Sequence, residues 1–238
     1  MARTRAIPLA DDVWRIPTSL GDLVNTFALR DADGTVTLVD AGLRWLASGR
    51  IMAGLSEIGA RPTDVRRIVV THAHLDHAGG LPNLVKATGA AVLTHERDAI
   101  YLRDGRIPRS DRSTRAARIA GRFAAKRLPK VVVSGEFADG AVLPVAGGLR
   151  VVHTPGHTPG HVSLLHERSG VLITGDAVFN VRGLRWSPSW LCTDPTVNRR
   201  SADRLGELDF EIAAFTHGPE VRERAREAVR AFLRGRER

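Results

Sequence analysis

The stretch Thr71–Gly80, THAHLDHAGG, holds four potential metal ligands: His72, His74, Asp76 and His77. It follows the apolar run RRIVV, which is typical of a short buried strand. Residues two apart in an extended segment point to the same side, so His72 and His74 can reach one ion. Asp76 and His77 lie beyond them, where a helix is expected to begin near Ala78. Imidazole nitrogen and carboxylate oxygen both bind zinc, so this pattern favours a metal site over a polar surface loop.

Four ligands do not complete two metal shells, so further ligands are expected at other strand ends. Three candidates each follow an apolar run and stand beside glycine or proline: His157 in TPGHTPGH, Asp176 in LITGDA and His217 in AFTHGP. This recurrence predicts loops gathered at one edge of the sheets.

The stretch Val151–Val162, VVHTPGHTPGHV, spaces three histidines four residues apart, as one face of a helix would. Pro155 and Pro159 exclude a helix, because they remove amide donors and favour extended conformations before them. We therefore expect only His157 to be a metal ligand. His161 is predicted to support a ligand or to pack, and His153 to be structural.

Composition favours a soluble globular protein, since 238 residues with 43% hydrophobic content can bury a core. The first residues contain no apolar run typical of a signal peptide, and no later run approaches the length of a membrane span. The chain is therefore expected to be cytoplasmic and not membrane-bound. A single cysteine, Cys192, excludes an internal disulfide and a multi-cysteine zinc site.

The net charge of +9 raises the possibility of nucleic-acid binding. Aromatic residues make up only 5% of the chain, however, so surfaces for base stacking would be sparse and nucleic acid is not the expected partner. The most basic segment, at about 97–130, is expected to be a helical insertion with an amphipathic helix over Ser110–Leu128. The apolar side of this helix would use Ala116, Ile119, Ala120 and Phe123. It is either a solvated cover or a surface that recognises an anionic substrate, and both are compatible.

The apolar runs predict strands and helices in a repeated order. A hairpin is expected over Thr26–Arg30 and Val36–Asp40, with the turn DADG between. Helices are expected over Leu43–Ile58, Thr196–Leu205 and Pro219–Leu233. The remaining expected strands are RRIVVTH, AAVLTH, EIAAFTH, Val131–Val133, Ala141–Val145, Leu149–His153, His161–His166 and Val171–Thr174. This order indicates two layers of sheet packed face to face with helices outside, in one domain over residues 1–238.

The motifs THAHLDH, TPGHTPGH, GDA and THGP, in this order, resemble the metallo-β-lactamase superfamily of metal-dependent hydrolases. The resemblance runs from Asp40 to Gly218. It implies an α/β (α+β) fold, an αββα sandwich of two mixed sheets flanked by helices. By position, it implies a first metal on His72, His74 and His157, a second on Asp76, His77 and His217, and a bridging Asp176. Asp40 would orient a ligand.

The same resemblance implies a hydrolase in which a hydroxide bridging two divalent ions attacks the substrate, with catalytic roles for Asp76 and Asp176. Zinc is the expected metal, and iron and manganese also suit these ligands. Asp176 and the absence of a signal peptide disfavour β-lactam hydrolysis. Lactonases of the family place a tyrosine after the bridging aspartate, whereas this region contains three other candidates for a pocket wall or for core packing: Trp186, Trp190 and Cys192.

We therefore expect a small-molecule substrate that is an ester, thioester or lactone. The alternatives are a phosphodiesterase or nuclease of the same fold, and a metal-binding protein without useful turnover.

Overall fold

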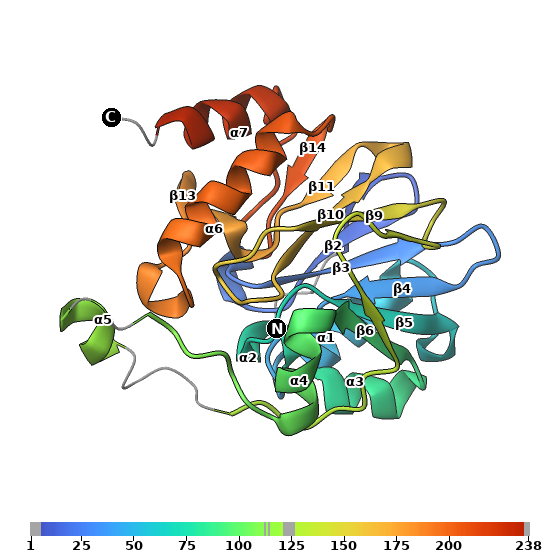
Figure 1. Ribbon diagram of the computed structural model, residues 1–238. Coiled ribbons are helices and arrows are strands. Elements are labelled where there is room, and N and C mark those ends of the chain that lie inside the picture. The colour runs from blue at the N-terminus through green and yellow to red at the C-terminus, as the bar shows by residue number, and fades with distance from the viewer. Residues whose placement is uncertain (1–5, 112, 114, 121–126, 236–238) are drawn as a thin grey trace.

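The first sheet has seven strands in sequence order. The computed structural model describes residues 6–111, 113, 115–120 and 127–235 (Figure 1). The strands are β1 (Ile7–Ala10), β2 (Val13–Pro17), β3 (Asn25–Arg30), β4 (Val36–Val39), β5 (Val65–Val70), β6 (Ala91–His95) and β7 (Gly135–Phe137). Neighbours are antiparallel from β1 to β4 and parallel from β4 to β7. The predicted hairpin is confirmed as β3–β4.

The second sheet has five strands in the order β14-β11-β10-β9-β8. Their bounds are β8 (Val142–Leu143), β9 (Leu149–His153), β10 (Val162–His166), β11 (Val171–Ile173) and β14 (Ile212–Ala214). The strands β11 and β14 pair in parallel and the other three pairs of these described strands are antiparallel, so this sheet is also mixed. A short antiparallel ribbon, β12 (Val178–Asn180) with β13 (Leu184–Trp186), follows β11 in the chain.

Helices cover the outer face of each sheet (Figure 1). On the first sheet the apolar sides of α1 (Ala47–Glu57), α3 (Leu81–Thr88) and α4 (Glu96–Asp104) pack on residues such as Ile68 and Val70. On the second, α6 (Pro195–Ala202) and α7 (Ala225–Arg234) pack on Val152 and Leu165. The predicted αββα sandwich is confirmed.

The alternation of side chains along each strand explains why the second sheet has an apolar core on both of its faces. Val151 and Leu164 face the first sheet and meet Phe27 and Val69, whereas their neighbours Val152 and Leu165 face α6 and α7. Side chains two apart along a strand share a face, so apolar residues at consecutive positions produce a sheet buried on both sides.

One predicted strand and two predicted helix starts are wrong. The valines at 131–133 form no strand, and pairing with β6 begins at Gly135. The first long helix begins at Ala47 rather than Leu43, since the residues before it form a turn in which Trp45 is 80% exposed. The last helix begins at Ala225, because Val221 pairs with Ala213 of β14 and residue 224 has a left-handed backbone.

The basic segment contains α4 and a short helix, α5 (Arg115–Ala120), which lies within the helix predicted over Ser110–Leu128. Of the other described residues in that range, 110, 111, 113, 127 and 128 are not helical, and 112, 114 and 121–126 lie outside the described residues. Ile119, predicted to lie on the apolar side, is 49% exposed. Phe123, predicted for the same side, lies outside the described residues. In the part of the chain that the structure describes, no helix has the length and apolar character needed to span a membrane.

Candidate metal centre

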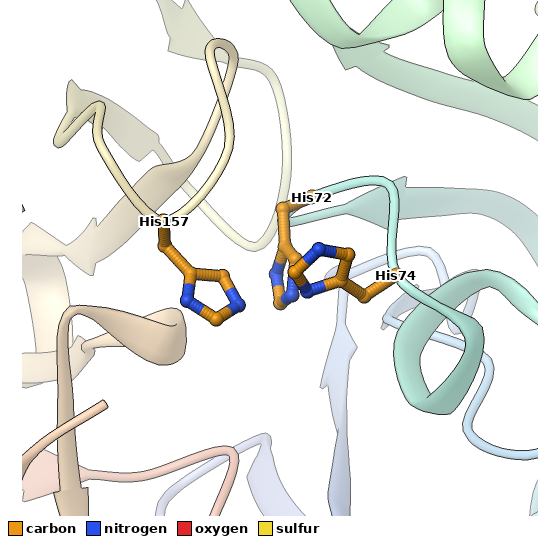
Figure 2. Close-up of side chains that lie close together, drawn as sticks. All are labelled: His72, His74 and His157. Atoms are coloured by element: carbon orange, nitrogen blue, oxygen red, sulfur yellow. The ribbon is translucent and has the colours of Figure 1, made fainter. Parts of the chain in front are cut away.

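Three histidines from two distant segments meet in a buried cluster, which we call the trihistidine group: His72, His74 and His157. His72 and His74 follow β5, and His157 lies in the loop between β9 and β10. Figure 2 shows the three imidazole rings close together. One nitrogen from each ring lies within 4.8 Å of those of the other two. The extended backbone at His74 agrees with the prediction that residues two apart reach one point.

A second cluster, which we call the mixed group, is formed by Asp76, His77 and His217. Asp76 and His77 lie on the short helix α2 (Leu75–Ala78), and His217 follows β14. The Nε2 atoms of His77 and His217 are 3.3 Å apart. Asp76 Oδ2 lies 3.5 Å from His217 Nε2 and 3.7 Å from His77 Nε2. The arrangement could hold one cation between three donors.

Asp176 lies between the two groups. Its Oδ2 atom is 3.2 Å from His157 Nε2 and 3.3 Å from His217 Nε2, and its Oδ1 atom is 3.3 Å from His77 Nε2. Thr216 donates a hydrogen bond to Oδ1 at 2.8 Å. One carboxylate therefore contacts ligand candidates of both groups.

The donor atoms fit divalent cations. His72 Nε2 is buried and, within the described residues, has no hydrogen-bond partner. A buried polar nitrogen without a partner is costly, and here it faces other ligand-type atoms. Imidazole nitrogens with carboxylate oxygens suit zinc, iron or manganese. The residues present therefore fit a bound metal.

Outward hydrogen bonds fix the rings. His77 Nδ1 is 2.8 Å from Asp40 Oδ2, and Asp40 also accepts hydrogen bonds from the backbone and hydroxyl of Thr71. His157 Nδ1 is 2.9 Å from Ser187 Oγ. His217 Nδ1 is 2.5 Å from the carbonyl oxygen of Leu23. Because one nitrogen of each ring is engaged outside the cluster, Nε2 faces inward.

His161 and His153 lie outside both groups. His161 Nδ1 is 2.9 Å from the carbonyl of Thr154, and its Nε2 accepts the backbone N–H of Asp176 at 2.7 Å. It therefore holds Asp176 in place. His153 stacks on His95, with ring centroids 4.2 Å apart, and its Nε2 is 2.9 Å from the carbonyl of Pro159.

Burial and the neighbouring charges shift the pKa values of the histidines, downwards for some rings and upwards for others. Burial, with repulsion from nearby imidazoles, holds the pKa of His72 and of His74 well below the usual value. Burial also opposes charge on His77 and His157, but carboxylates led by Asp176 outweigh it and raise their pKa to about 10 and about 9. Burial and His157 lower the pKa of His161 to about 3.

The carboxylate of Asp176 responds to the same field. Burial alone would raise its pKa, but His217, His77, His72 and His157 hold the pKa of Asp176 well below the usual range. The pKa of His217 is raised, because attraction to Asp176 outweighs burial. The centre is therefore arranged to keep one shared carboxylate ionised.

Two polar residues near the centre were not predicted from the sequence. Ser187 contacts His157 from 30 positions away, and nothing in the local sequence marks it. Asp98 is buried and bonds to both segments of the trihistidine group. Its position just after the strand end at His95 is a signal that could have identified it. Burial raises the pKa of Asp98, although three donated hydrogen bonds oppose the shift.

The predicted wall residues have different environments. Trp186 packs against Phe232 with ring centroids 4.7 Å apart, whereas Trp190 is 36% exposed. Cys192 is buried with its sulfur 3.6 Å from His157 Nδ1. The basic segment reaches this region, since the backbone N–H of Asp111 donates to the carbonyl of Cys192 and α5 lies beside the turn Ser189–Leu191.

Comparisons with known proteins identify a family and similar proteins. The family described as "Metallo-beta-lactamase superfamily" matches residues 20–217, which include all seven ligand candidates. The protein YobT of Bacillus subtilis (strain 168) is 30% identical over 226 residues, covering 89% of this chain and 91% of YobT. An N-acyl homoserine lactonase of Bacillus sp is 29% identical over 168 residues, covering 67% of this chain and 57% of the lactonase. The crystal structure of a metallo-beta-lactamase family protein from Thermus thermophilus has a TM-score of 0.74 and 28% identity, covering 97% of this chain and 81% of that one.

Proposed function

Because the chain belongs to the metallo-β-lactamase superfamily and is a metal-dependent hydrolase, we propose that it uses a dinuclear centre to cleave a small ester, thioester or lactone. The carboxylate of Asp176, in contact with both ligand groups, is the observation that carries this proposal. The trihistidine group holds one ion and the mixed group the other, with Asp176 between them. Zinc is the proposed metal.

The bound ions would lower the pKa of a shared water molecule and polarise a substrate carbonyl. The chain's own residues supply the geometry for this. Asp40 keeps the Nδ1 atom of His77 engaged and leaves Nε2 directed inward. His161 and Thr216 hold Asp176 through its backbone N–H and its Oδ1 atom.

The open side of the centre indicates where substrate enters. His72, His77 and His157 are fully buried, whereas the Asp76 side chain is 34% exposed and that of His217 is 12% exposed. Substrate therefore approaches over the mixed group.

The loop beside that entrance carries two exposed leucines. Leu23, whose carbonyl contacts His217, is 51% exposed, and Leu20 is 71% exposed. Exposed leucines at the entrance favour a substrate with an apolar group over a polyanionic phosphodiester. The similarity to an N-acyl homoserine lactonase supports the lactone class.

The test combines metal analysis with a panel of lactone, thioester, β-lactam and bis-phosphodiester substrates. We expect two metal ions per chain and turnover of a lactone or thioester. Asp76→Ala and Asp176→Ala should each lower turnover at least about 100-fold, because each removes a metal ligand. Asp209→Ala, at an 82% exposed side chain paired with Arg226, is the matched control and should behave as the wild type.

The other outcomes identify the alternatives. Turnover of the bis-phosphodiester alone would replace this proposal with a phosphodiesterase. Two bound ions without turnover of any substrate would indicate a metal-binding protein. Unchanged turnover in Asp176→Ala would refute the bridging assignment.

A further inference from the structure

Asp98, on the first turn of α4, is a buried carboxylate outside the proposed ligand set. It is 0% exposed. Among the described residues it forms no ion pair with a lysine or arginine. An ionised carboxylate away from water is costly unless several donors satisfy its oxygens. Its surroundings must therefore supply those donors.

Three donors from two distant segments meet this carboxylate. Oδ2 accepts the backbone N–H of Ala73 at 2.8 Å and the hydroxyl of Thr158 at 2.7 Å. Oδ1 accepts the backbone N–H of Gly160 at 2.7 Å. Ala73 stands between His72 and His74, and Thr158 directly follows His157 in sequence. One side chain therefore joins the two segments that form the trihistidine group.

The segment that contains Thr158 and Gly160 packs so closely on Asp98 that there is no room for a larger residue at position 160. A Cβ atom at Gly160 would lie 2.6 Å from the backbone nitrogen of Asp98 and 2.8 Å from its Oδ1 atom. The loop after His157 is thus packed directly on α4, which follows β6 of the first sheet. Asp98 connects the first sheet to a loop of the second.

We propose that Asp98 is a positioning residue that sets the distance between the His72–His74 segment and His157, and so controls metal affinity at the trihistidine group. This inference rests on the ligand assignment of the proposed function. Three imidazoles carry no negative charge, so a buried carboxylate bonded to the adjoining backbone also favours a cation there. The mixed group has no contact with Asp98 and should be affected much less.

The test is a Zn²⁺ titration of the metal-free protein against a chromophoric chelator, which resolves the two binding steps. His157→Ala and His217→Ala identify the steps, because each removes a ligand of only one group. Asp98→Asn should weaken the step that His157→Ala removes by about 10 to 100-fold and leave the other within about threefold. Asp104→Asn, at the exposed end of the same helix, is the matched control and should leave both steps unchanged.

A second pair of variants covers the case in which Asp98→Asn does not fold. Thr158→Val removes one of the three donors, whereas Thr158→Ser keeps the hydroxyl. We expect Thr158→Val to weaken the same step and Thr158→Ser to restore it.

Equal weakening of both steps, or none, in Asp98→Asn and Thr158→Val would overturn the positioning role while leaving the hydrolase proposal intact. A wild-type chain that binds no Zn²⁺ would overturn both proposals.

Discussion

At the scale of single residues, the centre depends on nitrogens that face in two directions. The Nδ1 atoms of His77, His157 and His217 each contact an oxygen outside the cluster, while their Nε2 atoms face Asp176. This arrangement fixes ring orientation before any metal binds, which lowers the cost of assembling the site. The same carboxylates that would hold cations attract protons to His77 and His157.

We predict that metal binding at pH 7.5 releases at least about two protons per chain. The pKa of His77 is about 10 and that of His157 about 9, so both rings are protonated at pH 7.5 in the metal-free protein. A metal ligand must be a neutral imidazole, so both protons must leave. Affinity should therefore fall as pH is lowered. Isothermal titration calorimetry in buffers of different ionisation enthalpy measures the number of protons released.

The matched control for this measurement is Asp209→Ala, at a side chain that is 82% exposed and paired with Arg226. Its replacement should leave the number of released protons unchanged. A wild-type heat of binding that is independent of the buffer would contradict the prediction.

At the scale of elements, the sequence predicted strand interiors better than element ends. Apolar runs located β5, β6, β9, β10 and β11, because a buried strand requires apolar residues on its faces. The strand predicted over Val131–Val133 does not form: Val132 is 83% exposed and the segment lies outside the sheet. Whether an apolar run pairs depends on its neighbours in space, which the local sequence does not contain.

The candidate site shows the same division. All seven predicted ligands are brought together, because each lies in a loop or short helix that follows an apolar strand and strand ends share an edge. Ser187 and Asp98 were missed, because their partners are far away in the sequence. Ser187 contacts His157 across 30 positions, and Asp98 contacts Thr158 across 60. Long-range hydrogen bonds leave no periodic signal in the sequence.

The loop that carries His157 should be sensitive to Gly156. This glycine has φ +121°, and a Cβ atom there would lie 2.1 Å from the backbone nitrogen of Asn198 on α6. Gly156→Ala should therefore cost more than the roughly 1–3 kcal/mol expected for backbone strain alone, and should weaken metal binding at the trihistidine group. Urea denaturation of the metal-free protein and a Zn²⁺ titration measure the two effects.

Gly183→Ala is the control for Gly156→Ala. Gly183 has a similar φ of +104°, but among the described residues no atom beyond its chain neighbours lies within 4 Å of the position of its Cβ. It should show the cost of strain without the clash and without a change in metal affinity. Equal destabilisation by the two variants would mean that contact with α6 does not constrain the loop.

At the scale of the whole molecule, the centre joins the two sheets. His72, His74 and His77 follow β5 of the first sheet, whereas His157, Asp176 and His217 follow strands of the second. Apolar contacts such as those of Leu164 hold the same sheets together between their inner faces. Metal binding and core packing therefore act on one interface at different places.

We predict that removing metal lowers the melting temperature by roughly 10 °C or more. An ion at about 1,000 times its dissociation constant stabilises the folded chain by about 4 kcal/mol, and each kcal/mol corresponds to about 2–4 °C at this chain length.

Leu164→Ala should cost about 2–5 kcal/mol through a cavity between the sheets, with or without metal. The two ligand groups lie at the sheet edge, away from this cavity, so the Leu164→Ala variant should bind as many ions as the wild type. Calorimetry of both proteins, with Zn²⁺ and after chelation, tests this: a wild-type melting temperature that chelation leaves unchanged would show that the ions do not link the sheets.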